Sequence, residues 1–229
     1  MAQLLDKIAA WLKPKTTANQ NISMGAEKEM SPSQLDELLK WGDKCADVPY
    51  AEMSIEQKLM TFRYFADLGD AEGQFQLGMM YNEGLGVKQD IEQALVLFRK
   101  SAEQEFPLAQ YNLGCMHEQG LGVVQSRSLA IKWYLKAANQ GLSKAQYNLG
   151  VYYEQVSTPP NPAIAVTWYQ KSAEQGYIEA QYNLGLLYAK GIGIAEDQGT
   201  ALTLFRKAAK QGHANALAIL ELHKLQLNR

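Results

Sequence analysis

The chain has 229 residues, of which 47% are hydrophobic and 20% charged, so it can form one large or two small domains with a buried core. Its 22 basic and 24 acidic side chains leave a formal net charge of −2. Because nucleic-acid binding normally needs a basic surplus, we expect no nucleic-acid partner. The two cysteines, Cys45 and Cys115, are too few for a disulfide framework and fit a reducing compartment.

The amino terminus, MAQLLDKIAAWLKPK, lacks the features of an export signal. Asp6 and Lys7 interrupt the apolar run after two leucines, and no small-residue cleavage site follows Leu12. No stretch of the sequence reaches the roughly 18 to 20 continuous apolar residues of a membrane-spanning helix. We therefore expect a soluble, cytoplasmic protein without a transmembrane segment.

Residues 1–32 are expected to form a short amphipathic helix and a flexible linker. The apolar residues of segment 2–12 share one helical face and are Leu4, Leu5, Ile8, Trp11 and Leu12. We interpret this helix as a cap folded back on the rest of the chain, the alternative being peripheral contact with a membrane or a partner. Residues 13–32 have no apolar period and are predicted to be the linker.

The hexapeptide AQYNLG occurs three times, and a related GQFQLG precedes it. The glycines that close these four segments follow one another at intervals of 36, 36 and 35 residues and are Gly78, Gly114, Gly150 and Gly185. A second landmark follows at the same period, at Ala94, Ala130, Ala165 and Ala201. Two landmarks at one period indicate a unit of two elements. Such self-similarity is typical of a solenoid of helical pairs.

Both elements of the unit have the apolar spacing of a helix. Ala180, Leu184 and Leu187 fall at i, i+4 and i+7 of the first element, and Ala130 and Trp133 begin a similar stripe in the second. Small residues on these stripes let neighbouring helices approach, while aromatic rings fill the space between layers. The sequence therefore predicts an all-α fold, an α/α solenoid of helix-turn-helix repeats with a period of 35 to 36 residues.

The ends of the second helix carry matching signals in the repeats. The predicted N-caps have side chains that accept hydrogen bonds from free backbone N–H groups, and they are Asp90, Ser126, Asn161 and Asp197. Pro162 follows one of them, at the favoured first-turn position. The helix is predicted to stop at a left-handed glycine, at Gly141, Gly176 and Gly212.

The same period extends beyond the clear copies. Residues 33–69 are predicted to be a divergent first repeat, in which SIEQKLMTFRYFADL is the second helix. Four repeats follow in residues 70–212, and residues 213–229 are expected to form a C-terminal capping helix, ANALAILELHKLQL. Its outer side is expected to be more polar than that of the other first helices, because it carries Glu221, His223, Lys224 and Gln226.

The repeats share the pattern A-x-x-x-L-G-x-x-Y-x-x-G-x-G-V, followed by an acidic cap, A-x-x-W-Y-x-K-A-A and a closing glycine. This pattern resembles the Sel-1-like repeat, a relative of the tetratricopeptide repeat. The resemblance is strong over residues 70–221 and weak over 33–69. It implies a right-handed superhelical solenoid that serves as a non-catalytic adaptor or scaffold, often in bacteria, with another protein or peptide as its partner.

The resemblance also leaves two alternatives open. One is an immunity-type protein that neutralises a toxic effector. The other is a β-lactam or peptidoglycan-fragment hydrolase, because one branch of the family is linked with such activity. That branch carries a disulfide in each repeat, and this chain lacks the paired cysteines. Cys115 instead occupies an apolar position of the repeat and is interpreted as a filler.

We expect no catalytic residues, no cofactor and no metal site. The glycine turns EGLGV, QGLGV and KGIGI lack the further residues of a phosphate-binding loop and recur at the repeat period, so they are interpreted as turns between helices. The third copy has QVSTPPNP instead, which suggests a kink or a contact edge. His117 stands where other copies have Tyr81, Tyr153 and Tyr188, and we interpret it as a satisfied packing residue.

An aromatic row along the first helices is the candidate protein-binding surface. At 100° per residue, Tyr182 points nearly opposite to the main apolar stripe of its helix. The candidate residues are Phe75, Tyr111, Asn112, Tyr147, Asn148, Tyr182 and Asn183. Asparagine can pair with both the N–H and the C=O of a peptide, so we interpret the row as a concave groove for an extended peptide. The alternative is that the rings pack against neighbouring first helices.

Overall fold

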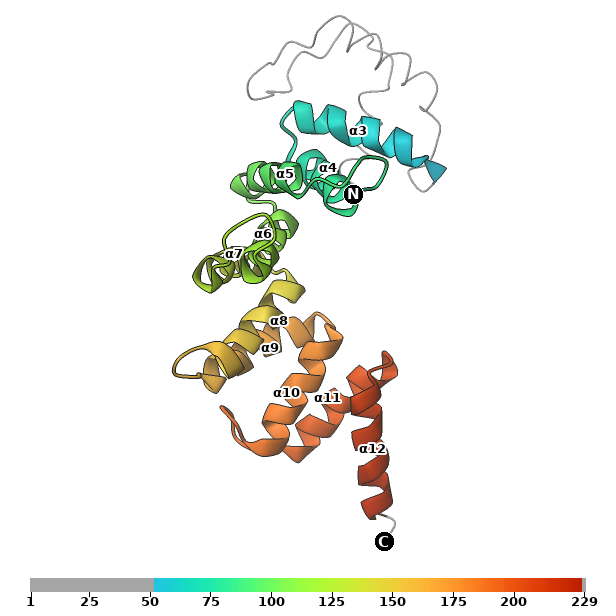
Figure 1. Cartoon of the computed structure of the whole chain (residues 1–229). Helices are drawn as coiled ribbons and strands as arrows, with labels where there is room; N and C mark the ends of the chain where they lie inside the picture. The colour runs from blue at the N-terminus through green and yellow to red at the C-terminus, as the bar shows by residue number, and fades with distance from the viewer. Residues whose placement is uncertain (1–51, 228–229) are drawn as a thin grey trace, which may run out of the picture. The chain divides into compact units, whose positions relative to one another are not determined.

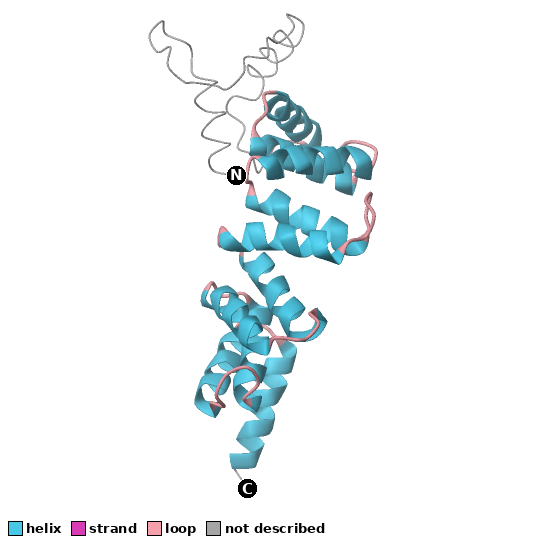
Figure 2. Ribbon diagram, turned by 90° about the vertical axis from the view of Figure 1, so that its left-hand side faces the viewer, coloured by secondary structure: helices cyan, strands magenta, loops and turns pink. Residues whose placement is uncertain are grey.

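The structure is a computed structural model that describes residues 52–227 (Figure 1). These residues form ten α-helices and one short π-helix, and no strand occurs among them (Figure 2). They belong to two compact units, the first ending at Gln104 and the second beginning at Glu105. The predicted segment 2–12, the linker 13–32 and residues 33–51 of the divergent first repeat lie outside the described residues.

The described part of the first unit, residues 52–104, contains three helices that pack in chain order, α3 on α4 and α4 on α5. Their bounds are Ile55–Asp67 for α3, Ala71–Glu83 for α4 and Ile91–Glu103 for α5. Helix α3 lies within the stretch predicted as the second helix of segment 33–69. Its Phe62 and Phe65 share a buried cluster with Leu77 and Met80 of α4.

The second unit contains seven α-helices and the π-helix, and consecutive helices again pack against one another. They are α6 (Pro107–Gln119), α7 (Arg127–Asn139), α8 (Ser143–Val151), η2 (Tyr152–Val156), α9 (Pro162–Glu174), α10 (Ile178–Lys190), α11 (Gln198–Lys210) and α12 (Ala214–Leu227). The predicted all-α fold, a solenoid of helix-turn-helix repeats, is confirmed. Helix α12 coincides with the predicted ANALAILELHKLQL.

Within each repeat, the glycine of AQYNLG or GQFQLG lies directly against an aromatic ring of the second helix. A Cβ atom built on Gly114 would lie 2.5 Å from the Tyr134 ring, and one on Gly150 would lie 2.4 Å from the Tyr169 ring. The equivalent pairs are Gly78 with Phe98 and Gly185 with Phe205. These distances are shorter than a carbon–carbon contact, so only glycine fits. The predicted spacer role of these glycines is confirmed.

The second helices begin at the predicted caps. Each cap side chain accepts a hydrogen bond from the backbone N–H three residues later, at 2.9 to 3.4 Å, and the four caps are Asp90, Ser126, Asn161 and Asp197. The backbone N–H of the cap also donates to the first helix, as from Ser126 to the His117 carbonyl at 2.8 Å. Each cap therefore starts one helix and ties it to the other.

The second helices end as predicted, beside Gly141, Gly176 and Gly212, all with positive φ. At the start of the second unit, however, the equivalent position holds Glu105, which has a φ of 63°. Glutamate can adopt this conformation only at a cost, because its Cβ crowds the backbone there. The left-handed turn is thus imposed by the packing of the repeat even where no glycine favours it.

The third repeat has a different turn sequence, QVSTPPNP, but keeps the hydrogen bond that closes the turns of the other repeats. Val156 stands where Gly120 has a φ of 73° in the second repeat. Because valine disfavours that conformation, the chain continues as η2, in which the Ser157 N–H donates to the Tyr152 carbonyl at 2.8 Å. The equivalent bond in the glycine turn joins Leu121 to Met116 at 3.0 Å.

The glutamine of AQYNLG joins successive repeats, a role that was not predicted from the sequence. Gln146 is 4% exposed and accepts a hydrogen bond from Gln175 at 2.7 Å. Its own Nε2 donates to the Ala138 carbonyl of the preceding repeat at 3.1 Å. Gln181 repeats the arrangement one unit later. A buried carbonyl left unpaired would cost about 1–3 kcal/mol, so this bond stabilises the stacking.

The Gly114→Ala variant tests the spacer role. The added Cβ collides with the Tyr134 ring, so we expect the free energy of unfolding to fall by about 1–3 kcal/mol, as in other overpacked cores. Denaturant unfolding followed by circular dichroism measures the change. The matched control is Gly199→Ala, whose Cβ would meet only the Asp197 carboxylate, at 3.3 Å, and which should change stability by no more than about 0.5 kcal/mol. Equal effects of the two substitutions would contradict the assignment.

Candidate functional site

The first helices of the middle repeats are covered on two opposite sides. In α10, Ala180 and Leu184 belong to the cluster formed with α9, whereas Tyr182 and Leu186 pack against the cluster of α11 and α12. In α8, likewise, Tyr147 packs against the α9 cluster while the opposite stripe faces α7. The aromatic row is therefore also a second packing side of these helices.

At the two ends of the predicted row, the rings lie in closely packed surroundings. Phe75 in the first unit is 7% exposed, and its ring centroid lies 5.8 Å from that of Phe98. Tyr182 is half-buried, with its ring 5.9 Å from Phe205 and stacked at 4.3 Å on His213. Most of the surface of these two side chains therefore packs against other residues of the protein.

The central rings keep more contact with solvent. Tyr111 and Tyr147 are half-buried, at 5.6 Å from Tyr134 and 5.9 Å from Tyr169 respectively. The three predicted asparagines are half-buried as well, and they are Asn112, Asn148 and Asn183. We call Tyr111, Tyr147, Asn148 and Asn183, all in the second unit, the tyrosine–asparagine row.

Two tyrosine–glutamate pairs lie beneath this row. The hydroxyl of Tyr134 donates to Glu118 at 2.7 Å, and that of Tyr169 donates to Glu154 at 2.7 Å. Burial raises the pKa of both tyrosines far above its ordinary value, and the neighbouring carboxylates add to the increase. Both hydroxyls therefore stay protonated and act as donors.

The carboxylates of these pairs could have been found from the sequence. Where the second helix has tyrosine, the first helix of the repeat has Glu118, or the π-helix that continues it has Glu154. Where the ring is Phe98 or Phe205, the same position holds Asn82 or Ala189. A buried phenol needs an acceptor, whereas a phenyl ring does not, so the two positions change together.

The Tyr169 hydroxyl fixes the orientation of Asn183. Because its hydrogen is given to Glu154, its oxygen is free to accept, and the Nδ2 of Asn183 donates to it at 3.3 Å. Asn183 also forms a hydrogen bond with Tyr147 that favours the ionised phenol and so opposes the rise of its pKa from burial. Asn148 bonds Tyr111 in the same way. The amide nitrogen of Asn183 is thus directed into the protein.

Tyr177 and two carboxylates border the row, and none of the three was predicted from the sequence. The ring of Tyr177, the residue before α10, lies 5.2 Å from that of Tyr147. Burial raises the pKa of Tyr147, and the charges of Glu179 and Glu154 raise it further. Both carboxylates therefore act on the hydroxyl of Tyr147 and make its surroundings negative.

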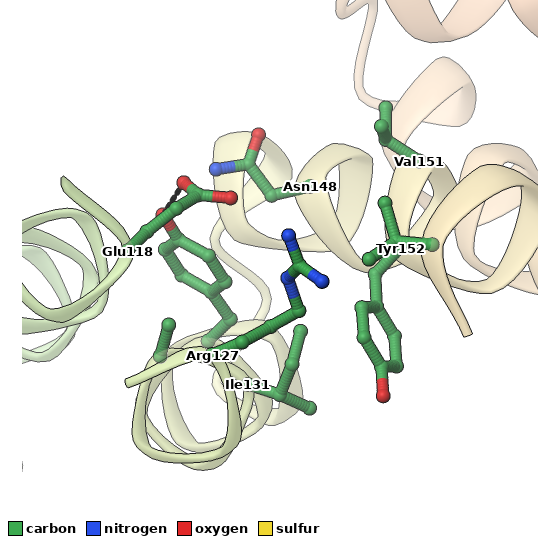
Figure 3. A pocket seen from close by; sticks show the side chains of 9 residues that line it. Glu118, Arg127, Ile131, Asn148, Val151 and Tyr152 are labelled. Atoms are coloured by element: carbon green, nitrogen blue, oxygen red, sulfur yellow. Dashed lines mark hydrogen bonds between the residues drawn. The ribbon is translucent and has the colours of Figure 1, made fainter. Parts of the chain in front are cut away.

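A small pocket adjoins the row between α7 and α8. Its volume is about 80 Å³, and Figure 3 shows Glu118, Arg127 and Asn148 reaching toward it from three different helices. Apolar side chains, including Ile131 and Val151, complete its wall. The pocket has room for a few water molecules or one short side chain.

His117 differs in part from the prediction. It is 9% exposed and packs as expected, but its Nδ1 finds no hydrogen-bond partner among the described residues. The hydroxyl that the other repeats carry at this position is missing, so the ring fills the space without satisfying its polar atom. No group of three or more His, Cys, Asp and Glu side chains within residues 52–227 could hold a metal ion. None of the described helices combines the length and apolar composition of a membrane span.

The Tyr134→Phe variant tests the buried pair. In the folded chain burial holds the pKa of Tyr134 well above its ordinary value of about 10, whereas the unfolded chain ionises near that value. Stability is therefore lost as pH rises above about 10, by up to about 1.4 kcal/mol per pH unit for each such tyrosine. We expect the free energy of unfolding of the variant to fall less steeply with pH than that of the unaltered chain. Denaturant titrations at a series of alkaline pH values measure the slopes, and identical slopes would contradict the assignment.

Four segments of the chain match the model of the Sel1 repeat, at residues 71–106, 107–142, 143–177 and 178–213. A Sel1 repeat protein from Oxalobacter formigenes has a similar structure, with a TM-score of 0.71 and 35% identity over 74% of this chain and 49% of its own. A protective antigen with an SLR fold from uropathogenic Escherichia coli gives 0.69 and 32%, over 81% of this chain and 39% of its own. An immunity protein from Pseudomonas aeruginosa shares the fold, with a TM-score of 0.52 and 20% identity over 83% and 69% of the two chains.

The match spans about half of the Oxalobacter protein and less than half of the Escherichia coli antigen. No protein among curated sequences matches the chain. Sel1 repeat solenoids are generally non-catalytic and commonly serve as scaffolds for protein interaction. Because the four matched segments make up more than half of its 229 residues, the chain belongs to the Sel1 repeat family.

Proposed function

We propose that the chain is a non-catalytic interaction scaffold that binds an extended peptide segment of another protein along the tyrosine–asparagine row. The orientation of the Asn183 amide carries this proposal. Its nitrogen is engaged by the hydroxyls of Tyr169 and Tyr147, so its carbonyl oxygen Oδ1 is the group left to accept a hydrogen bond from a ligand.

A matching donor lies beside this acceptor. The oxygen of Tyr147 takes a hydrogen bond from Asn183, and the hydroxyl keeps its own hydrogen to donate. A donor and an acceptor at neighbouring positions suit the C=O and N–H groups of an extended peptide. The repeat places an equivalent pair, Tyr111 with Asn148, one unit earlier. A peptide running along the unit would therefore meet the same polar pair twice.

The rings beside these polar groups are held in place before any partner binds. Tyr147 packs against Tyr169 on one side and Tyr177 on the other. A half-buried, immobilised ring offers apolar area to a partner at little further cost in conformational entropy. Tyrosine is accordingly common among the residues that dominate binding energy at protein interfaces.

The charges around the row favour a partner segment that carries lysine or arginine. Glu154 and Glu179 both act on the Tyr147 hydroxyl. The pocket of about 80 Å³ beside Asn148 adds room for one short side chain of the same segment. Complementary charge would mainly speed association and select the partner, while the aromatic contacts supply affinity.

The two alternatives receive less support from the described residues. The likeness to the Pseudomonas aeruginosa immunity protein is one of fold, at 20% identity. The row would serve an immunity-type role equally well, with a toxic effector as the bound protein. No contact or charge among residues 52–227 specifically favours a hydrolase.

A displayed library of random peptides, selected on the immobilised full chain, tests the proposal. We expect the selected peptides to lose about tenfold or more in affinity for the Asn148→Ala, Asn183→Ala double variant, since each lost hydrogen bond is worth about 0.5–1.5 kcal/mol. Titration calorimetry or fluorescence anisotropy with the selected peptides gives the two dissociation constants. Asparagine is preferable to tyrosine as the site of change, because Tyr147 also packs in the core.

The matched control is the Asn139→Ala, Asn215→Ala double variant, which makes the same chemical change at two exposed positions. It should bind the selected peptides as the unaltered chain does. Circular dichroism must show equal helix content in all three proteins. Peptides that bind the row variant and the control equally well would refute the proposed surface.

A further inference from the structure

The pocket between α7 and α8 is lined by a cation and an anion that do not pair with each other. Arg127, the first residue of α7, and Glu118 of α6 both reach toward it (Figure 3). The two groups form no ion pair, since the nearest N···O distance between them is above 4.0 Å. No hydrogen bond within residues 52–227 engages the guanidinium of Arg127. Its five N–H donors are thus left for solvent or a ligand.

The carboxylate of Glu118 is held in place on its side of the pocket. Its Oε2 accepts the hydroxyl of Tyr134 at 2.7 Å, and a buried phenol needs this acceptor. Oε1 is left free to accept a second hydrogen bond. The backbone beside Arg127 is tied as well, because the Ser126 N–H donates to the His117 carbonyl at 2.8 Å. The pocket therefore has an acceptor and a set of donors that start from fixed positions.

This combination occurs in only one of the four repeats. The first residue of the second helix is Arg127 in the second repeat, whereas the other repeats have Ile91, Pro162 and Gln198 there. The third repeat has the equivalent carboxylate, Glu154, but its Pro162 has no side-chain donor. Tyr152 of the pocket wall belongs to η2, which replaces the glycine turn of the other repeats. The pocket therefore lies where the repeats differ from one another, and it can distinguish one partner from another.

We propose that this pocket is a subsite for a primary carboxamide, the side chain of an asparagine in the bound segment, and this inference rests on the proposed peptide-binding function. A carboxamide has one acceptor and two donors in a single plane. Its oxygen would accept from the guanidinium of Arg127, and its nitrogen would donate to Oε1 of Glu118. Both charged groups then have a partner. The pocket volume of about 80 Å³ suits a short side chain, and Ile131 and Val151 line the wall for its methylene group.

Other small side chains meet only part of this arrangement. A carboxylate attracts Arg127 but is repelled by Glu118, and an ammonium group has the opposite difficulty. A leucine side chain of similar size removes water from both polar groups and gives neither a partner, which is costly. A serine hydroxyl can donate and accept, but it is about the size of one water molecule and leaves most of the pocket unfilled. The carboxamide meets the requirements of charge, hydrogen bonding and size together.

Peptides selected on the full chain from a displayed random library test the subsite. We expect asparagine to be enriched at one peptide position. Changing it to aspartate or leucine should weaken binding about tenfold or more, because a hydrogen bond to a charged group is worth at least about that factor. The Arg127→Met variant should lose a similar factor for the asparagine peptide. The matched control is Arg206→Met, which makes the same change at an exposed position of α11 and should bind as the unaltered chain does.

The Glu118→Gln variant should change the preference of the pocket. Glutamine keeps an oxygen for the Tyr134 hydroxyl and places its Nε2, a donor, where Glu118 has a free acceptor. A carboxylate then meets donors on both sides. We expect the ratio of affinities for the asparagine and aspartate peptides, about tenfold or more on the unaltered chain, to fall to about one or below. Titration calorimetry gives these ratios, and circular dichroism must show equal helix content in all variants.

Failure of the subsite and failure of the proposed function give different results. The subsite alone is overturned if the peptides are weakened by the Asn148→Ala, Asn183→Ala double variant but show no preference for asparagine. It is equally overturned if Arg127→Met binds the asparagine peptide normally, or if Glu118→Gln leaves the ratio unchanged. Peptides that bind the double variant as tightly as the unaltered chain overturn the proposed function, and the subsite with it.

Discussion

The contact between the AQYNLG glycine and the facing aromatic ring determines the rest of each repeat. At Gly114 there is no room for a methyl group, so the first helix lies directly on the face of Tyr134. The ring then fills the space between the two helices, and its identity has a further consequence. A phenylalanine is satisfied by burial alone, whereas the hydroxyl of Tyr134 must find an acceptor, which Glu118 supplies at 2.7 Å.

This packing constraint leads directly to the polar surface. Tyr169 gives its hydrogen to Glu154, and for that reason its oxygen can receive a hydrogen bond from Asn183. The amide is held with its nitrogen inward, and its carbonyl oxygen remains for a ligand. The buried hydroxyl of Tyr169 must have hydrogen-bond partners. Meeting this need also fixes the carbonyl oxygen of Asn183, which is an acceptor on the face where we propose that a peptide binds. Stability and recognition depend on the same hydrogen bonds.

The fold could be predicted from the sequence because its signals are local and repeated. Cap residues, spacer glycines and apolar periods each act within a few residues, and four copies made the pattern unambiguous. The role of Gln146 could not be predicted in this way, because its partners lie 8 residues before it and 29 residues after it, in contact only once the helices stack. The same holds for Glu105, whose left-handed backbone is imposed by the surrounding packing and opposed by its own preference.

The letters of AQYNLG can now be assigned separately. Alanine, leucine and glycine pack, glutamine links successive repeats, and tyrosine packs with one part of its ring still in contact with solvent. If the asparagine and tyrosine supply hydrogen bonds to a peptide backbone, they do so alike in each repeat and cannot distinguish one partner from another. Discrimination then falls to exposed positions that differ between repeats, such as Leu108, Lys144 and Glu179, which occupy equivalent places on α6, α8 and α10. An apolar, a basic and an acidic side chain at equivalent positions along one face would each contact a different side chain of a bound segment.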